Sequence, residues 1–167
     1  MTLPQVETLL DDMVARLLTH LATRDIAAPR FAGIRTGGVW IAEAVAARCN
    51  AADPGGIIDI GFHRDDVGQR AELPRLGPSS IPWDINGRDI VLIDDILHTG
   101  RTARAALNAL FDWGRPRSVN LAVLVELPGR ELPLQPDVVG ASIGARTGHE
   151  LRLLGPQPLE LAWRASA

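Results

Sequence analysis

Two adjacent carboxylates, Asp94 and Asp95, lie between an apolar segment and a loop of small residues. The apolar segment, Ile90 to Ile93, is rich in β-branched residues and too short for an isolated helix, which predicts a strand buried on both faces. The loop, residues 99–102 with the sequence Thr-Gly-Arg-Thr, leads into a helical pattern. Backbone N–H groups at a helix start bind phosphate, and carboxylates at a strand end accept hydrogen bonds from hydroxyls or approach a cation. The stretch therefore predicts an anion site beside a polyol or metal site.

A second unit of strand, glycine loop and helix comes earlier in the chain. Arg30 to Ile34 predicts a strand, Arg35-Thr36-Gly37-Gly38 forms the loop, and the sequence VWIAEAVAARC that follows has helical spacing. Two such units predict a parallel α/β sheet in which both loops lie at the carboxyl edge. By itself a Thr-Gly-Gly turn is usually only a tight connection. Beside the loop at 99–102 it predicts a second phosphate contact.

The remaining segments complete the predicted sheet and its cover. Helical periodicity spans residues 3–23, and apolar runs predict strands at 57–62 and 119–125, with short strands after residue 138. Residues 67–86 carry three prolines and two glycines with little periodicity. A loop this long inside a compact domain is uncommon unless it is functional. We therefore expect a mobile arm over the site, in preference to a disordered linker.

Composition narrows the classes of protein. A length of 167 residues predicts one domain, residues 1–167, and the net charge of −3 argues against strong nonspecific binding of nucleic acid. All 17 basic residues are arginine, which excludes a Walker A loop and Schiff-base chemistry because both need lysine. The single cysteine, Cys49, excludes an internal disulfide framework. No membrane-spanning run or signal-peptide pattern occurs, so we expect a cytoplasmic protein without membrane partners.

The central motif resembles a known signature. IVLIDDILHTGRT resembles the phosphoribosyl-pyrophosphate (PRPP) motif of type I phosphoribosyltransferases. The segments GIRTGG, PWDINGRDIVLIDD, GRTARAALNALFDWGRP, LAVLVE and RELPLQPDVVG look like the PyrR family, which combines a pyrimidine-operon attenuator with a uracil phosphoribosyltransferase. The resemblance covers residues 33–140. It implies a type I phosphoribosyltransferase fold: a central, mostly parallel sheet flanked by helices, a long flexible arm at about 67–86, and a small C-terminal hood. It also implies a homo-oligomer, a dimer or larger.

The resemblance assigns a reaction and roles to residues. It implies that uracil and PRPP react to give UMP and pyrophosphate, with Arg35, Asp94 and Asp95 as the catalytic residues. Mg²⁺ is expected to bridge pyrophosphate and ribose oxygens without a dedicated protein cage, with the two aspartates as candidate ligands. The predicted base-binding residues are Leu127, Arg130 and Ile143. The predicted PRPP-binding residues are Arg35, Thr36, Gly37, Asp94, Asp95, His98, Thr99, Gly100, Arg101 and Thr102.

Three positions near the substrate depart from the family pattern. The family typically has arginine where this chain has Gly37, and Leu127 replaces an arginine associated with substrate. The tyrosine of the phosphate loop is His98 here. These departures leave open a phosphoribosyltransferase that acts on another nucleobase.

Three further departures concern RNA. Gly129 replaces a histidine associated with RNA, and Gln135 and Ala141 stand where RNA-binding members usually have basic residues. Phosphate contacts supply much of the affinity of a protein for RNA. The alternative to the uracil enzyme is therefore a regulator with weak or no enzyme activity that senses UMP or UTP and binds pyrimidine-operon mRNA.

Overall fold

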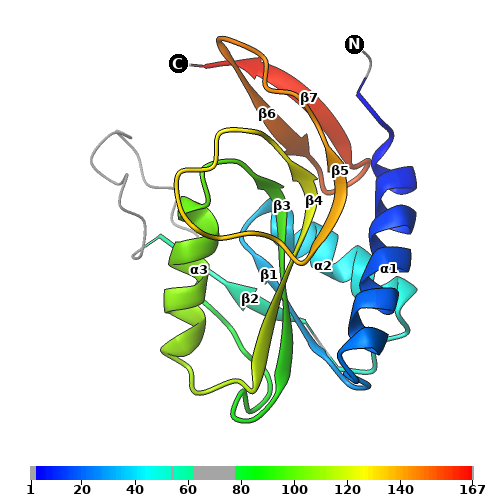
Figure 1. The fold of residues 1–167 in the computed structure, drawn as a ribbon, viewed down its shortest axis with the longest axis vertical. Coiled ribbons are helices and arrows are strands. Elements are labelled where there is room, and N and C mark those ends of the chain that lie inside the picture. The colour runs from blue at the N-terminus through cyan, green and yellow to red at the C-terminus, as the bar shows by residue number, and fades with distance from the viewer. Residues whose placement is uncertain (1–2, 54, 62–77, 167) are drawn as a thin grey trace.

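Five parallel strands form the centre of the computed structural model, which describes residues 3–53, 55–61 and 78–166. The order across the sheet is β2-β1-β3-β4-β5, so the strand of the acid pair, β3, is the central one (Figure 1). The predicted parallel α/β sheet is confirmed. The strands are β1 (Arg30–Ile34), β2 (Gly56–Ile58), β3 (Asp89–Leu97), β4 (Ser118–Glu126) and β5 (Val138–Ser142).

Helices cover both faces of this sheet (Figure 1). Alternate residues of β3 point to opposite layers: Val91 and Ile93 pack in the cluster of α1 and α2, and Ile90 and Leu92 in the cluster of α3. All four are fully buried, which explains why this strand is a continuous apolar run. The helices are α1 (Val6–Thr23), α2 (Gly37–Arg48) and α3 (Arg101–Phe111). Within the described parts of the chain, no helix combines the length and apolar character needed to cross a membrane.

The central strand continues past the two carboxylates. The sequence suggests that Asp94 and Asp95 close the strand, but β3 extends to Leu97. The reason is its long pairing with β4, in which Asp94 lies opposite Val123 and Leu97 opposite Glu126. Asp94 and Asp95 therefore lie inside β3, before its last two residues, where the strand is still paired with β4.

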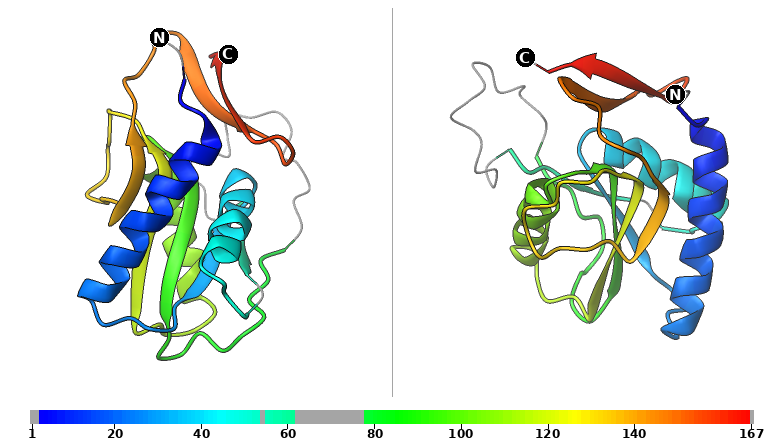
Figure 2. Two further views of the ribbon diagram at one scale, coloured as in Figure 1. Left: turned by 90° about the vertical axis from the view of Figure 1, so that its right-hand side faces the viewer. Right: turned by 45° about the horizontal axis from the view of Figure 1, so that its top comes forward.

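A two-stranded antiparallel hairpin, β6 (His149–Leu154) and β7 (Glu160–Ala165), forms the C-terminal hood. Figure 2 shows it across the carboxyl edge of the sheet, above the α1 and α2 side. Leu151 and Leu153 are buried in the same cluster as α1 and α2. At the hairpin turn, a Cβ added to Gly155 would lie 2.8 Å from Cε3 of Trp40, so the turn packs closely on α2. The hood is thus part of the core.

The predicted arm is only partly within the described residues. Residues 67–77, and the segment 63–66 before them, lie outside these residues. The end of the arm packs on the fold: Ser80 forms an antiparallel bridge with Ile57, and Ile85 is 2% exposed. β2 is shorter than the predicted strand at 57–62, because Asp59 leaves the sheet and its N–H donates to Oγ of Ser79 at 2.8 Å.

Candidate active site

A cavity of about 880 Å³ lies between the carboxyl ends of β3 and β4 and the hood. Its wall brings together both predicted phosphate loops and the acid pair, although these segments are about 60 residues apart in sequence. Five of the predicted site residues are not among the described residues of the wall: Arg35, Gly37, Arg101, Arg130 and Ile143. The predicted site residues that line it are Thr36, Asp94, Asp95, His98, Thr99, Gly100, Thr102 and Leu127.

The two carboxylates differ in environment. Asp94 is 3% exposed, and its Oδ1 accepts a hydrogen bond from the N–H of Asp95 at 3.1 Å. Asp95 is half-buried. Because adjacent residues of a strand point to opposite faces, the two carboxylates leave the backbone in opposite directions. The pair therefore places one carboxylate on each side of the end of β3, and both residues line the cavity.

The Thr-Gly-Arg-Thr loop provides the start of α3. Gly100 has φ of 89°, in the left-handed region that favours glycine, and Arg101 is the first helical residue. The N–H of Arg101 donates to Oγ1 of Thr99 at 3.3 Å, and the N–H of Arg104 donates to the carbonyl of Gly100 at 3.0 Å. Thr99 and Thr102 line the cavity beside this helix start. Such a loop can bind a phosphate with backbone and hydroxyl donors.

The second loop, at Arg35 and Thr36, joins β1 to α2. The N–H of Arg35 donates to the carbonyl of Ile58 at 2.9 Å, which ties the loop to β2. Nε of Arg35 lies 3.6 Å from Oδ2 of Asp59, so the guanidinium forms an ion pair behind the loop. The peptide bond between Arg35 and Thr36 is cis. Thr36 lines the cavity, so the loop reaches the site through its backbone and this threonine.

The segment after β4 carries the predicted base-binding residues. Leu127 is buried, and its N–H donates to the carbonyl of Leu97 at 2.8 Å. The N–H of Ile143 donates to the carbonyl of Glu126 at 2.9 Å, whereas Nη1 of Arg130 reaches the carbonyl of Leu134 at 3.4 Å. Of the three predicted base-binding residues, the structure brings only Leu127 to the cavity.

Comparison with known proteins identifies the family. Residues 5–148 match the phosphoribosyl transferase domain. The Bifunctional protein PyrR of Pseudomonas fluorescens is 48% identical over 161 residues, which cover 96% of this chain and 96% of that protein. The Bifunctional protein PyrR of Pseudomonas aeruginosa is also 48% identical, over 96% of this chain and 95% of that protein. The chain belongs to the PyrR family of phosphoribosyltransferases.

Solved structures agree with the fold of this family. A hypoxanthine-guanine phosphoribosyltransferase from Bacillus anthracis matches with a TM-score of 0.68 and 17% identity, over 86% of this chain and 83% of that chain. A purine phosphoribosyltransferase from Pyrococcus horikoshii matches with a TM-score of 0.58 and 21% identity, over 86% and 84%. At such identities the likeness concerns the fold alone. It confirms the type I phosphoribosyltransferase fold for this PyrR family member.

The predicted phosphate loop at 99–102 has a partner that the sequence did not reveal. Oε2 of Glu131 lies 2.9 Å from Nε of Arg101, and the N–H of Glu131 donates to the carbonyl of Thr99 at 2.9 Å. The N–H of Leu132 reaches the same carbonyl at 3.3 Å. The loop after β4 and the phosphate loop are therefore joined. Their sequence separation of about 30 residues hid this contact, and no local pattern could have found it.

The hood adds a second group of residues that sequence reasoning missed. Arg152 and Glu150 form an ion pair, with Nη2 2.8 Å from Oε2, and both line the cavity. Nδ1 of His149 lies 3.0 Å from the carbonyl of Thr147. The alternation of polar and apolar residues along β6 was a usable signal for the strand, but not for its position over the cavity. The hood residues of the wall are His149, Glu150, Leu151, Arg152, Leu153, Trp163, Ala165 and Ser166.

The acid pair suits the metal that the resemblance implies. Mg²⁺ prefers oxygen ligands and retains water and phosphate oxygens. Asp94 and Asp95 present carboxylate oxygens in the cavity wall. In the described part of the chain, no group of three or more His, Cys, Asp or Glu side chains is placed to hold a metal ion. Two carboxylates and the oxygens of a phosphorylated substrate together fit such an ion.

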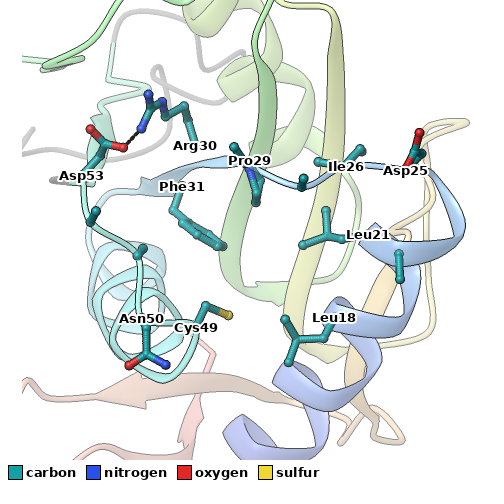
Figure 3. Close-up of a pocket in the computed structure, with 15 residues that line it drawn as sticks. Leu18, Leu21, Asp25, Ile26, Pro29, Arg30, Phe31, Cys49, Asn50 and Asp53 are labelled. Carbon is teal, nitrogen blue, oxygen red and sulfur yellow. Dashed lines mark ion pairs between the residues drawn. The ribbon is translucent and has the colours of Figure 1, made fainter.

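A second cavity, of about 610 Å³, lies at the amino edge of the sheet (Figure 3). Phe31 and Cys49 line it together with Leu21 of α1, and an ion pair between Arg30 and Asp53 stands at its rim. Burial raises the pKa of the Cys49 thiol, which favours the unreactive protonated form. None of the predicted site residues lines this cavity. The predicted site residues that line a cavity lie at the opposite, carboxyl edge of the sheet.

Proposed function

We propose that this PyrR family member transfers the 5-phosphoribosyl group of PRPP to uracil, giving UMP and pyrophosphate. The observation that carries the proposal is one cavity wall that contains Asp94, Asp95 and three residues of the helix-start loop: Thr99, Gly100 and Thr102. A phosphate held at a helix start beside two carboxylates matches ribose 5-phosphate, which combines an anion with two neighbouring hydroxyls.

The proposed roles follow from the elements that hold each group. The loop at 99–102 binds the 5′-phosphate with backbone N–H groups and the hydroxyls of Thr99 and Thr102. Asp94 and Asp95 accept hydrogen bonds from the ribose hydroxyls. Thr36, on the neighbouring loop, contacts the pyrophosphate. These assignments place the two anionic ends of PRPP at two loops of the same sheet edge, with the sugar between them.

Arg35 takes an indirect role in this proposal. Its guanidinium faces Asp59 at 3.6 Å, and its side chain is about a quarter exposed. Nε of Arg35 and Oδ2 of Asp59 are both buried. Separating them would leave a buried charge without its partner, so Arg35 acts through the loop that carries Thr36. Mg²⁺, when bound, would neutralise charge on the pyrophosphate oxygens. Asp94 and Asp95 are the residues that would hold it.

The chemistry needs positioning more than covalent help. Uracil N1 bonds to the anomeric carbon as the bond from that carbon to the pyrophosphate oxygen breaks, and the N1 proton passes to the departing pyrophosphate or to solvent. Positive charge develops on the ribose ring in the transition state. Carboxylates fixed near that ring stabilise such charge without reorganising, and the loops of the cavity wall keep the reacting atoms in line. Asp94 is well suited to this task because its side chain is buried and held by the N–H of Asp95.

The base is assigned to the side of the cavity formed by Leu127 and the hood. Leu127 can pack on a planar base but donates no hydrogen bond from its side chain, so the polar edge of uracil must be read by other groups. Arg152 and Glu150 are charged side chains of that part of the wall. We assign base recognition to this region and to the backbone beside it.

RNA-dependent regulation is outside the proposal. Gly129, Gln135 and Ala141 carry no positive charge at positions where the resemblance implies basic residues.

The proposal does include a homo-oligomer. Phe111 and Trp113, which are 53% and 46% exposed at the end of α3, are apolar surface that a second copy would cover. Sedimentation analysis tests this part, and a monomer at all concentrations would contradict it.

The enzyme proposal is tested with a panel of bases. The protein is incubated with PRPP, Mg²⁺ and one base at a time: uracil, hypoxanthine, guanine or orotate. We expect UMP and pyrophosphate with uracil, and slower or no product with the others. Turnover of a purine or orotate in preference to uracil would replace the proposed substrate. Absence of turnover with every base would overturn the enzyme assignment.

A further inference from the structure

Asp59, the first residue after β2, is held in place by hydrogen bonds to two neighbouring segments. Its N–H donates to Oγ of Ser79 at 2.8 Å, and the Ser79 hydroxyl reaches the carbonyl of Asp59 at 3.3 Å. Oδ1 of Asp59 accepts a hydrogen bond from the N–H of Gly61 at 2.8 Å, as in an Asx turn. These contacts fix the orientation of the carboxylate and leave its Oδ2 for a different partner.

The second carboxylate oxygen of Asp59 faces the guanidinium of Arg35. Oδ2 of Asp59 lies 3.6 Å from Nε of Arg35, and both atoms are buried. Neither atom has a hydrogen-bond partner among the described residues. The two opposite charges therefore compensate each other by proximity. Removal of one charge would leave the other buried and uncompensated, which costs far more than removal of a surface charge.

Arg35 connects this carboxylate to the active-site cavity. The N–H of Arg35 donates to the carbonyl of Ile58 at 2.9 Å, so the backbone and the side chain of Arg35 are both held at the end of β2. The next residue, Thr36, lines the cavity and precedes the first residue of α2. Asp59 itself is not among the described residues of the cavity wall. Any effect of Asp59 on the cavity must therefore pass through Arg35 and Thr36.

A role in the turn alone would make a different prediction for Asp59. An Asx turn needs only an oxygen acceptor, which asparagine supplies as well as aspartate. If the turn were the whole role, Asp59→Asn would be silent and Asp59→Ala damaging. The buried position opposite Arg35 requires a negative charge in addition, which asparagine lacks. Substitution by asparagine thus separates the charge from the turn.

We infer that Asp59 is a positioning residue that holds the Arg35-Thr36 loop against β2. The inference rests on the proposed function, in which Thr36 contacts the pyrophosphate of PRPP. Without the charge of Asp59, the Arg35 guanidinium moves toward solvent and takes the loop with it. The loss falls on PRPP, because uracil is assigned to the side of the cavity formed by Leu127 and the hood. Asp59 therefore acts on one substrate and not on the other.

Steady-state kinetics of Asp59→Asn test this inference, at a temperature at which thermal denaturation shows every variant to be folded. We expect the KM for PRPP to rise roughly tenfold, whereas kcat and the KM for uracil change less than about twofold. Loss of folded protein would instead lower the apparent kcat and leave both KM values alone. Asp59→Glu, which restores the charge, should recover part of the lost affinity for PRPP.

A double-variant cycle separates an indirect from a direct role of Arg35. If Asp59 acts by compensating the buried guanidinium, Arg35→Gln removes the charge that Asp59→Asn leaves unpaired. The double variant should then have a KM for PRPP no higher than that of Asp59→Asn alone. A direct contact of Arg35 with pyrophosphate predicts instead that the two effects add, and additive effects would overturn the inference.

Two controls match the test variant. Asp53→Asn removes a carboxylate that pairs with Arg30 at the amino edge of the sheet, away from the cavity wall, and should leave the KM for PRPP unchanged. Ser79→Ala removes the hydrogen bonds to the backbone of Asp59 but keeps its charge, so it should raise this KM less than about threefold. A rise in Ser79→Ala equal to that in Asp59→Asn would contradict the role of the charge.

Failure of the inference differs from failure of the proposed function. A wild-type KM for PRPP in Asp59→Asn would overturn the inference while the enzyme assignment stands. Absence of turnover by the wild type with every base would overturn the proposed function. A crystal structure of Asp59→Asn needs no PRPP and decides the inference in either case: displacement of Arg35 and Thr36 supports it, and an unmoved loop contradicts it.

Discussion

The carboxylate of Glu131 holds the guanidinium of Arg101, with Oε2 2.9 Å from Nε. Arg101 begins α3, and Glu131 belongs to the loop that follows β4. The N–H of Glu131 also donates to the carbonyl of Thr99 at 2.9 Å. The loop at 99–102 and the loop after β4 are therefore held together by both backbone and side chain. In the proposed function the charge of Arg101 supports this connection, and the 5′-phosphate contacts come from N–H groups and hydroxyls.

Removing this charge pair should alter kinetics more than stability. In Glu131→Gln we expect kcat/KM to fall roughly three- to tenfold, because the two loops lose part of their mutual orientation. Both side chains are about half exposed, so the free energy of unfolding should change by less than about 1 kcal/mol. Steady-state kinetics and urea denaturation give both values. Glu7→Gln is the matched control, since Glu7 pairs with Arg48 on the surface, away from the cavity. Equal kcat/KM for the two variants would contradict the coupling.

A buried carboxylate at the amino end of β3 predicts a dependence of stability on pH. Oδ1 of Asp89 accepts hydrogen bonds from Nε of Arg117 at 2.9 Å and from Oγ of Ser118 at 2.7 Å. The hydrogen bond from Arg117 holds the pKa of Asp89 below its ordinary value, against the opposing effect of burial, and Ser118 adds to the lowering. Such a group stabilises the fold above its ordinary pKa of 3.8, and this contribution is lost as the pH falls through the folded value.

Asp89→Asn should therefore lower the melting temperature at pH 7, by roughly 2–6 °C. The difference from the wild type should shrink as the pH falls below about 4, because the carboxylate of the unfolded chain then binds a proton more readily than that of the folded chain. Differential scanning calorimetry from pH 7 to pH 3 measures it. Asp12→Asn, an exposed position on α1, provides the control with little change at any pH. A difference that stays constant down to pH 3 would show that charge is not the cause.

The hood should respond to loss of a single buried side chain. Leu151 is 3% exposed, packs in the core cluster of α1 and α2, and lines the active-site cavity. We expect Leu151→Ala to lower the free energy of unfolding by about 2–4 kcal/mol and to raise the KM for uracil, because the wall over the base becomes less ordered. Leu18→Ala, half exposed beside the other cavity, should cost much less. Unfolding by urea and initial-rate kinetics measure the two effects, and equal stability of the variants would contradict a buried hood.

The parts of the fold visible in the sequence are those encoded by neighbouring residues. The apolar run Ile90 to Ile93 predicts a strand buried on both faces because each residue touches one of two helical layers. The loop from Thr99 to Thr102 predicts a helix start because threonine and glycine are preferred in the residues just before a helix. The acid pair and this loop are only a few residues apart at the carboxyl end of one strand. They therefore meet in one cavity whatever the rest of the sheet does.

The parts that the sequence did not reveal depend on distant segments. The continuation of β3 to Leu97 depends on its pairing with β4. Two consecutive acidic residues are untypical of a buried strand, so the sequence indicated an earlier end. Two ion pairs join residues that are far apart in sequence. Arg35 pairs with Asp59, about 24 residues away, and Arg101 pairs with Glu131, about 30 residues away. The apolar face of β6 could be recognised in the sequence. Its place above the acid pair could not, because that place is set by the packing of Leu151 on the α1 and α2 layer.

The most direct measurement is formation of UMP from uracil and PRPP by the wild-type protein and by Asp94→Asn and Asp95→Asn. Each substitution keeps the shape of the side chain and removes its charge. We predict that the wild type forms UMP and that each variant loses roughly a hundredfold or more in kcat/KM, while Asp12→Asn stays near wild type. UMP formation at wild-type rates in both variants would contradict the site. Absence of UMP formation in the wild type would contradict the function.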